Sequence, residues 1–514
     1  MFHLWITILA AVIAIAYNVF RYIHNHRNYW KRRNVIGPEP SFWFGNLKEL
    51  IRPEYPAPLQ IRDWTKEYGK IYGIQEGWPS TLVISDLDMM QDLFVKKFEQ
   101  FYGRKTLPFI GNVDKDKDVH VFAARGLRWK RLRTLSNPVF SVNSLRKIKH
   151  TVEDSVNVMV GYLEENADTE KSFNIHLYYQ QLTMDVIARI AMGYKESQQF
   201  RNEYFDLVKA MFERPANHPF AVAFNALPPI FASIVRYLAI RTAKMRSMPF
   251  PFLKEQIEKA VNERRKMRSE NSGKGEATDF IDLFLDAEAD VDLSTTGYDR
   301  SNVKVERKLT SSEIVMQCFV FLLAGFDTTA NSLAYVSYCI AKNAEVRKRI
   351  QDEIDEICVD EEVSYEQIQR LKYLDMVVKE SLRLYPVAAF ASSRTCMQTT
   401  KLGDVEIEKG VCVIADVFSV HYDKKIWGED ADEFRPERWE NLQRHPLSWL
   451  PFGAGPRTCI GKKLADMEEK LALVHILRKY DIVAAPDTEK VLNLKGSATI
   501  APESVTVRLK TREL

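Results

Sequence analysis

One cysteine lies in a glycine-rich stretch, Phe452-Gly-Ala-Gly-Pro-Arg-Thr-Cys459-Ile-Gly461. Gly453 and Gly455 allow the backbone to turn tightly and to approach another group closely. The residues that follow Gly461 have helical periodicity, so Cys459 is expected at a helix N-terminus, where partial positive charge favours a thiolate. A thiolate in such a place can be a nucleophile or a metal ligand, and a simple packed thiol is the plainest alternative.

The other cysteines narrow this choice. None forms a C-x-x-C pair and they are scattered through apolar segments, which disfavours a disulfide framework and a zinc site. No nearby histidine pattern supplies the base that a cysteine nucleophile usually needs. A single axial thiolate to haem iron needs no second protein ligand, which suits a lone cysteine in this loop. The six cysteines are Cys318, Cys339, Cys358, Cys396, Cys412 and Cys459.

The loop resembles the haem-binding signature of cytochromes P-450, F-x-x-G-x-R-x-C-x-G. The matching residues are Phe452, Gly453 (in its usual Gly-or-Ser place), Gly455, Arg457, Cys459 and Gly461. Four further motifs occur in the family's order, namely Trp129-x-x-x-Arg133, Ala324-Gly-Phe-Asp327-Thr328-Thr, Glu380-x-x-Arg383 and Phe434-Arg-Pro-Glu-Arg438-Trp. The resemblance covers essentially the whole chain. It is greatest to the microsomal animal clan that oxidises drugs and steroids, and within it to nematode-type members.

The resemblance implies a haem b cofactor (iron protoporphyrin IX) with Cys459 as the axial ligand of the iron. It implies that Arg457, Trp129 and Arg133 pair with the haem propionates, for which charged donors are suited. Taken alone, Trp129 and Arg133 would most often be a core aromatic residue and a solvated charge. The cofactor-binding residues expected on this basis are Cys459, Arg457, Trp129, Arg133, Phe452, Gly453, Gly455 and Gly461.

Two residues in the middle of a long predicted helix are the expected catalytic pair. The resemblance implies that Thr328 hydrogen-bonds dioxygen and that Asp327 passes protons to it through water. The plain alternative is that Gly325 and the neighbouring hydroxyls only bend or loosen the helix.

A third group is expected to be structural. Glu380 and Arg383 are i,i+3 neighbours on one helical face, and an exposed pair of this kind would contribute only a few tenths of a kcal/mol. The resemblance implies instead a buried triad of Glu380, Arg383 and Arg438 that supports the cysteine loop without taking part in the chemistry.

The N-terminus predicts a membrane anchor. Residues 4–20 are seventeen residues without a charge, at the short end of a membrane span. Ala14-Ile15-Ala16 resembles a signal-peptidase site, but all nearby basic residues follow the apolar run, the reverse of a signal peptide. The prediction is a single-pass protein of the endoplasmic reticulum membrane that faces the cytosol. Its parts are an anchor (1–23), a basic flank and proline hinge (24–40), and one catalytic domain (41–514).

The body is predicted to be mainly α with a small β-sheet (α+β), the cytochrome P-450 fold. Helices are expected at 145–165, 179–193, 250–267, 310–341, 342–358, 365–384 and 462–480, and strands at 71–75, 81–84, 404–407, 411–415 and 504–510. The helix at 310–341 is apolar enough to run through the core, with Thr310 or Ser311 as its N-cap. The polar segment 268–302 is expected to be a flexible connection. Residues 219–238, rich in Phe, Ala and Pro, are either a membrane-contacting surface or a core segment.

Charge and composition bear on partners and substrates. Lys plus Arg is 72 and Asp plus Glu is 69, so the net charge of +3 argues against a nucleic-acid binder. Two basic clusters are expected to steer NADPH–cytochrome P-450 reductase, with cytochrome b5 as a second electron donor. They comprise Arg125, Arg128, Lys130, Arg131, Arg146, Lys147, Lys149, Lys462 and Lys463.

The function expected is that of a haem-thiolate monooxygenase that uses O2 and NADPH-derived electrons. Its substrate is expected to be lipophilic (steroid, fatty acid or xenobiotic), because the expected pocket segments between them contain many Phe residues. These segments are 101–124, 212–225, 317–328, 387–393 and 496–501. Two alternatives stay open: a haem-thiolate isomerase or dehydratase acting on peroxides, and a non-catalytic haem sensor. The pair Asp327-Thr328 argues against the first of these.

Overall fold

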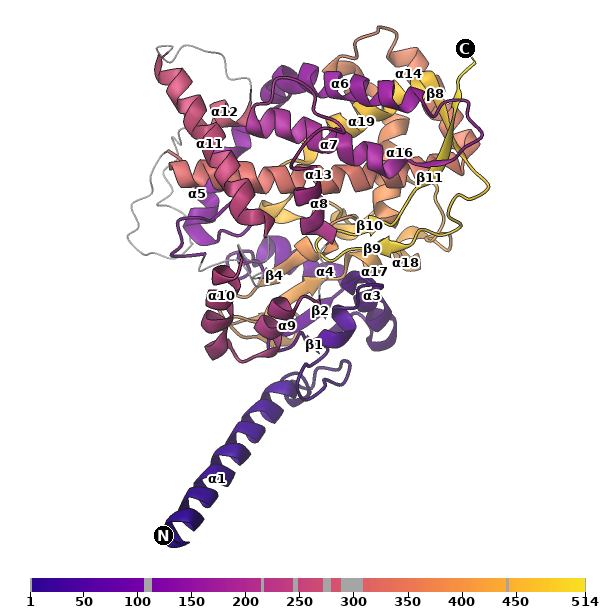
Figure 1. The fold of residues 1–514 in the computed structure, drawn as a ribbon. Coiled ribbons are helices and arrows are strands. Elements are labelled where there is room, and N and C mark those ends of the chain that lie inside the picture. Colours follow the sequence, from indigo (N-terminus) through magenta and orange to yellow (C-terminus); the bar gives the residue numbers. More distant parts are fainter. Residues whose placement is uncertain are drawn as a thin grey trace.

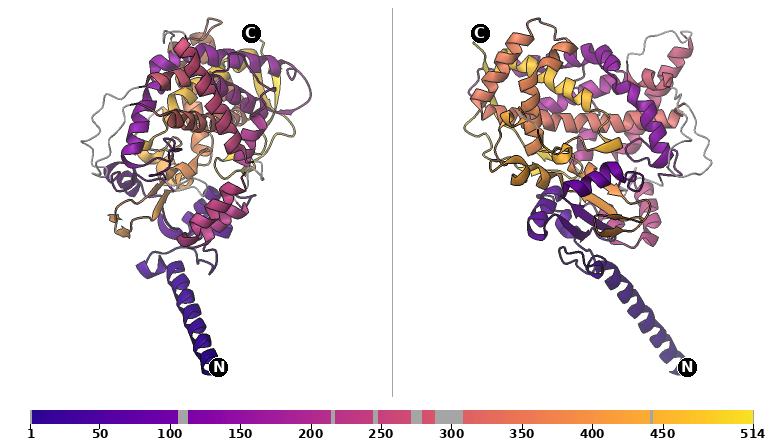
Figure 2. Two further views of the ribbon diagram at one scale, coloured as in Figure 1. Left: turned by 60° about the vertical axis from the view of Figure 1, so that its left-hand side comes forward. Right: turned by 180° about the vertical axis from the view of Figure 1, so that it is seen from behind.

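The computed structural model describes residues 2–105, 113–213, 217–243, 248–270, 279–287, 308–440 and 443–513. A long helix, α1 (Phe2–Arg27), projects from a body in which helices predominate (Figure 1). Both further views show α1 outside that body (Figure 2). The predicted class, mainly helical with small sheets, is confirmed.

Helix α1 is long and apolar enough to cross a membrane, and none of its apolar window is buried. It ends at Arg27, which is buried, rather than at residue 23. The basic flank and proline hinge, 24–40, is held against the body. The indole N–H of Trp30, for example, donates to the carbonyl oxygen of Ile74 at 3.0 Å. The division of the chain into anchor, hinge and domain stays a prediction.

A four-stranded sheet lies at the end of the body nearest α1, with the strand order β1-β2-β7-β4. Strand β2 is antiparallel to β1 and parallel to β7, so an N-terminal hairpin pairs with a strand more than 300 residues away. The strands are β1 (Ile71–Gln75), β2 (Ser80–Ile84), β4 (Ser393–Thr395) and β7 (Cys412–Ala415). All of β2 and β7 is buried, as expected of central strands covered on both faces.

The remaining strands are short. A three-stranded sheet has the order β3-β11-β8, and two pairs, β5-β6 and β10-β9, complete the set. Their bounds are β3 (Phe173–Asn174), β5 (Thr400–Leu402), β6 (Val405–Ile407), β8 (Tyr480–Ala484), β9 (Leu494–Lys495), β10 (Ala501–Pro502) and β11 (Thr506–Thr511). Every segment predicted to be a strand overlaps one, and the strands that were missed in the described residues have five residues or fewer.

Helix α13 (Ser311–Ala341) crosses the body, and 78% of its apolar window is buried (Figure 1). It is therefore a core helix, as predicted. Its start is a capping box: the Thr310 hydroxyl accepts from the Glu313 N–H at 3.2 Å, and the Glu313 carboxylate accepts from the Thr310 N–H at 3.0 Å.

The other long helices pack around α13. They are α6 (Val142–Glu164), α7 (Ile175–Met192), α11 (Pro249–Glu270), α16 (Lys372–Leu384) and α19 (Lys462–Lys479). The shorter helices are α2 (Leu47–Leu50), α3 (Ala57–Tyr68), α4 (Leu87–Gln91), α5 (Gly126–Ser136), α8 (Phe205–Glu213), α12 (Phe280–Asp286), α14 (Ala344–Ile357), α15 (Tyr365–Arg370), α17 (Val417–His421) and α18 (Lys424–Trp427). The single helix predicted at 365–384 is wrong, because Leu371 leaves the helical region (φ −71°, ψ 84°) and separates α15 from α16.

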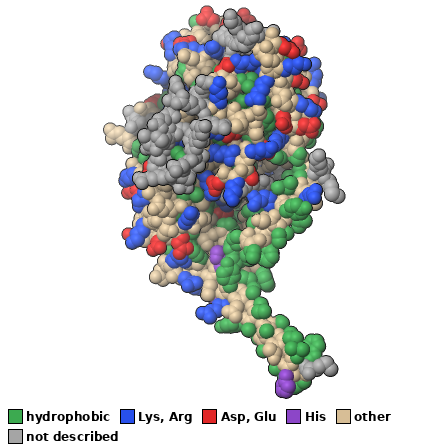
Figure 3. All heavy atoms as spheres, turned by 90° about the vertical axis from the view of Figure 1, so that its left-hand side faces the viewer, with side chains coloured by type: hydrophobic (Ala, Val, Ile, Leu, Met, Phe, Trp, Pro, Cys, Tyr) green, Lys and Arg blue, Asp and Glu red, His purple; other side chains and the backbone are tan. Residues whose placement is uncertain are grey.

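Residues 219–238 lie on the surface next to the base of α1. They form α9 (Pro219–Ala226), a 3-10 turn (Pro229–Phe231) and most of α10 (Ala232–Arg241). No residue of α9 or of the turn is buried, so the core interpretation is wrong there. Hydrophobic side chains cover α1 and continue onto the adjoining part of the body (Figure 3). Of the polar segment 268–302, residues 271–278 and 288–302 lie outside the described residues.

Candidate active site

The cysteine loop is closed just before α19. The N–H of Cys459 donates to the carbonyl oxygen of Phe452 at 2.9 Å. Gly453 and Gly455 have φ angles of +69° and +68°, in the left-handed region that favours glycine. A Cβ at Gly455 would also lie 2.0 Å from the carbonyl oxygen of Phe94. Both glycines are therefore required by the path of the backbone.

All six cysteines fall within the described residues and are free, and Cys459 is the exposed one. Its side chain is open to solvent on one side, but the protein packed around the sulfur raises the pKa of the thiol. The N–H groups of Gly461 and Lys462 and the guanidiniums of Arg133 and Arg104 lower that pKa without offsetting the burial. The helix N-terminus therefore favours the thiolate, as predicted, but its effect on the pKa is smaller than that of burial. A metal ion bound to the sulfur would lower the pKa of Cys459 further, because a coordinating thiol is deprotonated.

Trp129 and Arg457 lie together beside the loop. The guanidinium of Arg457 is 4.6 Å from the centroid of the Trp129 ring, and both residues are buried. Arg457 also donates to the carbonyl oxygen of Ala124 at 2.6 Å. Trp129 comes from α5, which also carries Arg133 one helical turn later. Arg133 is half-buried rather than solvated.

Arg104 was not singled out from the sequence, yet it faces the same thiol. It donates to the carbonyl oxygen of Ala391 at 2.6 Å, and its buried Nε has no hydrogen-bond partner within the described residues. Burial lowers the pKa of Arg104 to about 10, and Arg133 adds to this while the Cys459 thiol opposes it. Within the described part of the chain, neither Arg104 nor Arg133 is paired with a carboxylate. Two enclosed cations beside a cysteine fit a ligand that brings its own carboxylates, as haem does.

The middle of α13 places its two predicted catalytic residues in different surroundings. The hydroxyl of Thr328 donates to the carbonyl oxygen of Ala324 at 2.6 Å, and Ala324 is exposed although most of this helix is buried. A Cβ at Gly325 would lie 2.9 Å from Cδ1 of Ile187, so this glycine also lets α13 pack closely on α7.

Asp327, in contrast, points into the core. Its Oδ2 accepts a hydrogen bond from Asn331 Nδ2 at 2.8 Å and another from the hydroxyl of Thr499. Burial raises the pKa of Asp327 to about 6, although both hydrogen bonds oppose the rise. A carboxyl group with such a pKa can take up and release a proton near neutral pH.

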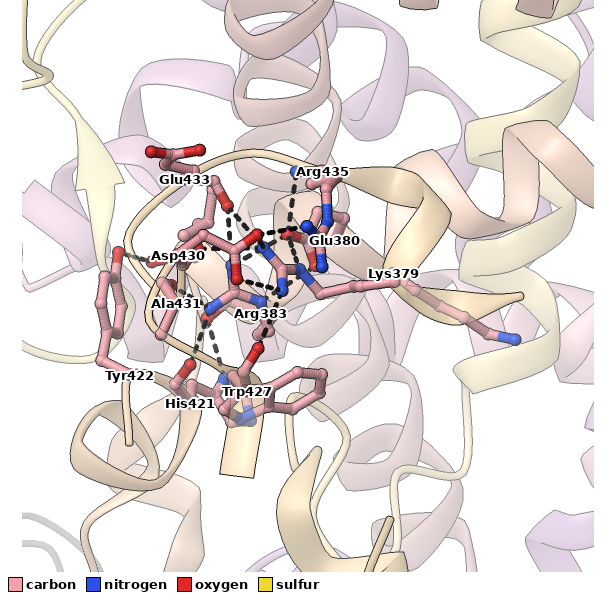
Figure 4. Close-up of polar contacts among 12 residues, drawn as sticks. Lys379, Glu380, Arg383, His421, Tyr422, Trp427, Asp430, Ala431, Glu433 and Arg435 are labelled. Atoms are coloured by element: carbon pink, nitrogen blue, oxygen red, sulfur yellow. Dashed lines mark hydrogen bonds and ion pairs between the residues drawn. The ribbon is translucent and has the colours of Figure 1, made fainter. Parts of the chain in front are cut away.

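Glu380, Arg383 and Arg438 form a buried ion-paired triad. Figure 4 shows Glu380 and Arg383 within this network of polar contacts. Arg383 binds the Glu380 carboxylate through Nε at 2.9 Å and Nη2 at 2.8 Å, and Arg438 Nε binds it at 2.6 Å. The indole N–H of Trp439 and the backbone N–H of Arg435 also donate to the carboxylate. None of the three charged side chains is exposed to solvent.

His421 joins the triad to the cysteine loop and was missed by sequence reasoning. Its Nδ1 is 3.0 Å from the carbonyl oxygen of Arg383, and its Nε2 accepts the N–H of Leu450 at 2.9 Å. Burial lowers the pKa of His421 to about 3, so the ring is neutral, with Nδ1 as donor and Nε2 as acceptor. Leu450 lies just before the loop that contains Cys459. The triad is thus connected to the loop by two hydrogen bonds through one buried ring.

The predicted basic face is smaller than expected. Arg131 is buried and paired with Glu313, and Lys149 is buried and bonded to Glu153 at 2.8 Å. Their charges are neutralised, so neither extends the face. Arg125 and Arg146 are ion-paired too, whereas Lys462 and Lys463 are exposed at the start of α19.

Comparison with known proteins agrees with this site. The family model described as Cytochrome P450 matches residues 36–509. Three similar Caenorhabditis elegans proteins, all named as putative cytochromes P450, are CYP13A8 (42% identity), cyp-13B1 (44%) and CYP13A4 (46%). The alignments cover 97%, 99% and 94% of this chain and 99%, 99% and 95% of the relatives, respectively.

The chain therefore belongs to the cytochrome P450 family. The predicted resemblance, including its nematode-type character, is confirmed. Membership identifies the protein as a P450 enzyme, a haem-thiolate monooxygenase whose cofactor contains haem iron.

Proposed function

We propose that this enzyme inserts one oxygen atom of O2 into a lipophilic substrate, a steroid, a fatty acid or a xenobiotic, and reduces the other to water. The observation that carries this proposal is the acid–alcohol pair Asp327-Thr328 in the middle of α13. Reducing the second oxygen atom consumes two protons, and a buried carboxyl group with a pKa of about 6 can take up and release them one at a time.

Each residue of the site has a proposed role. Haem b, when bound, supplies the redox-active iron that activates O2. Cys459 would be its axial ligand, and Arg457, Trp129 and Arg133, together with Arg104, would hold its propionates. Phe452, Gly453, Gly455 and Gly461 would shape the loop around Cys459.

Thr328 would present its hydroxyl on the exposed side of α13, and Asp327 would move protons toward it. Glu380, Arg383 and Arg438 would hold the loop in place.

The proposal also includes the location of the protein in the cell. Helix α1 would span the endoplasmic reticulum membrane once, with residues 41–514 as one catalytic domain in the cytosol. The basic residues Arg21, Arg27 and Lys31 all follow the apolar run, which favours this orientation. The exposed apolar side chains of α10, among them Ile234 (57% exposed) and Ile240 (64%), suit contact with the same membrane.

Electrons would come from NADPH through NADPH–cytochrome P-450 reductase, with cytochrome b5 as a second donor. Exposed cations at the start of α19, Lys462 and Lys463, directly follow the cysteine loop. A positive surface there would attract an acidic electron-transfer protein.

Oxidation of NADPH by the full-length protein, reconstituted with reductase in phospholipid vesicles, tests the proposal. A steroid, a long-chain fatty acid and an alkoxycoumarin serve as probes, with an organic hydroperoxide in parallel and Cys459→Ser as the control. NADPH oxidation that yields a hydroxylated or dealkylated product supports the monooxygenase. Conversion of the hydroperoxide without NADPH, and no NADPH-dependent product, would favour the isomerase. Haem binding without either reaction would favour the sensor.

A further inference from the structure

We propose that Thr499 is a positioning residue for Asp327, because its hydroxyl holds the carboxylate and ties it to the turn between β9 and β10. This inference rests on the proposed function, in which Asp327 moves protons. It makes the orientation of the carboxylate depend on a segment 172 residues away in the sequence.

The turn that carries Thr499 is fixed tightly to α13. Gly496 has φ +109°, and a Cβ there would lie 2.1 Å from the carbonyl oxygen of Thr499, so this tight turn requires glycine at that position. The hydroxyl of Tyr335 donates to the carbonyl oxygen of Ile500 at 2.9 Å. Asp327 and Tyr335 are about two helical turns apart on α13. Two hydrogen bonds therefore join one face of this helix to consecutive residues of the turn.

A second donor to the same carboxylate oxygen, Asn331 of α13, is itself held from α7. Asn331 Nδ2 donates to Asp327 Oδ2, and Asn331 Oδ1 lies 2.8 Å from His176 Nε2. Because that oxygen accepts, His176 Nε2 carries the hydrogen. Burial lowers the pKa of His176 to about 4, so the ring is neutral. Asp327 is thus bound by neutral donors alone, and within the described residues no cation is paired with it.

The charged and titratable groups near this network are few. Glu213 of α8 raises the pKa of Asp327, whereas the side-chain amide of Gln180 on α7 lowers it. Tyr335 is buried with its pKa raised well above the usual value, so it stays neutral. Lys209 of α8 acts on His176 rather than on Asp327 directly. With no cation to fix the charge, the two hydrogen bonds to Oδ2 have the largest lowering influence on this pKa.

Through the hydrogen bond from Thr499, the position of the turn affects proton delivery by Asp327. A hydroxyl that donates to a carboxylate favours its charged form. Displacement of the turn would break the bond from Thr499, raise the pKa of Asp327 and leave its carboxyl group less firmly oriented, with the hydrogen bond from Asn331 remaining.

Titration of the Asp327 carboxyl group in the holoenzyme tests this inference. Infrared difference spectroscopy follows the C=O band of the protonated acid, which is assigned by its absence in Asp327→Asn. Thr499→Val is expected to move the midpoint upward by about one pH unit, because one donor to the charged form is lost. Thr499→Ser keeps the donor and should titrate like wild type. Tyr335→Phe is the matched control, since it frees the same turn of a hydrogen bond that does not touch Asp327. An unchanged midpoint in Thr499→Val, or an equal shift in Tyr335→Phe, would overturn the inference.

A second readout separates this inference from the proposed function. The ratio of product to NADPH consumed at pH 7 should fall several-fold in Thr499→Val, with a matching release of hydrogen peroxide, and recover in Thr499→Ser. Haem content and the CO difference spectrum establish that each variant is folded and loaded. A shifted midpoint with an unchanged ratio would support the positioning of Asp327 by Thr499 but contradict the role of Asp327 as proton donor. An unshifted midpoint with a lowered ratio would overturn the positioning by Thr499 and leave the proposed function intact.

Discussion

Glu380 and Asp327 are both buried carboxylates on core helices, but they have opposite environments. Glu380 is held by the guanidiniums of Arg383 and Arg438 and by two further N–H donors. Asp327 has only neutral donors, and burial raises its pKa to about 6. A carboxylate with two cationic partners is suited to fixing a structure, whereas one without a cation is free to exchange protons. Glu380 is therefore suited to supporting the site, whereas Asp327 is suited to its chemistry.

Removing the anion of the triad should give the largest effect. Glu380→Ala leaves two guanidiniums buried without their partner, and the free energy of unfolding should fall by about 3–5 kcal/mol. Chemical denaturation measures this, and the variant should also lose haem. Glu429→Gln is the matched control, because Glu429 is 91% exposed in its pair with Lys424 and its loss should cost less than about 0.5 kcal/mol. Equal effects of the two variants would contradict a structural triad.

Replacing Asp327 should raise the stability relative to wild type as the pH increases, whereas replacing Glu380 lowers it. Its pKa is about 6 in the folded protein against an ordinary value of 3.8, so the folded state binds more protons between these values. Wild type therefore loses stability as the pH rises from about 3 to 7, by about 3 kcal/mol in total. Asp327→Asn does not titrate, so its stability relative to wild type should rise by about that amount over the same range. Denaturation curves at several pH values measure the difference, and a constant difference would mean that folding does not raise the pKa of Asp327.

The link between the triad and the cysteine loop should give a smaller effect. His421→Phe leaves the N–H of Leu450 and the carbonyl oxygen of Arg383 without this partner, at a cost of about 1–3 kcal/mol. We expect a lower midpoint of thermal unfolding and faster loss of haem. His150→Asn, a change at an exposed position on α6, should lie within about 0.5 kcal/mol of wild type. Haem retention equal to wild type in His421→Phe would show that the loop is held by other contacts.

The sequence predicted the parts of the site that are coded locally. The glycines of the cysteine loop, the capping box at Thr310 and the i,i+3 pair of Glu380 and Arg383 are all set by residues within a few positions of one another. The same holds for α13, whose apolar surface on all sides indicates a core helix.

The residues that were missed act through distant contacts. Arg104, His421 and Thr499 have key partners 287, 38 and 172 residues away. Each is an ordinary residue in its own segment, and only the fold gives it neighbours. The effect of burial was missed for the same reason. The helix N-terminus lowers the pKa of Cys459 as expected, but the packing that raises it comes from several elements.

The central claim is that Cys459 is the axial thiolate of the haem iron. The most direct test is the spectrum of the dithionite-reduced protein with CO, compared between wild type and Cys459→Ser. The claim predicts a strongly red-shifted Soret band in wild type that is lost in the variant. Haem binding by wild type without that band, or an unchanged band in the variant, would contradict it.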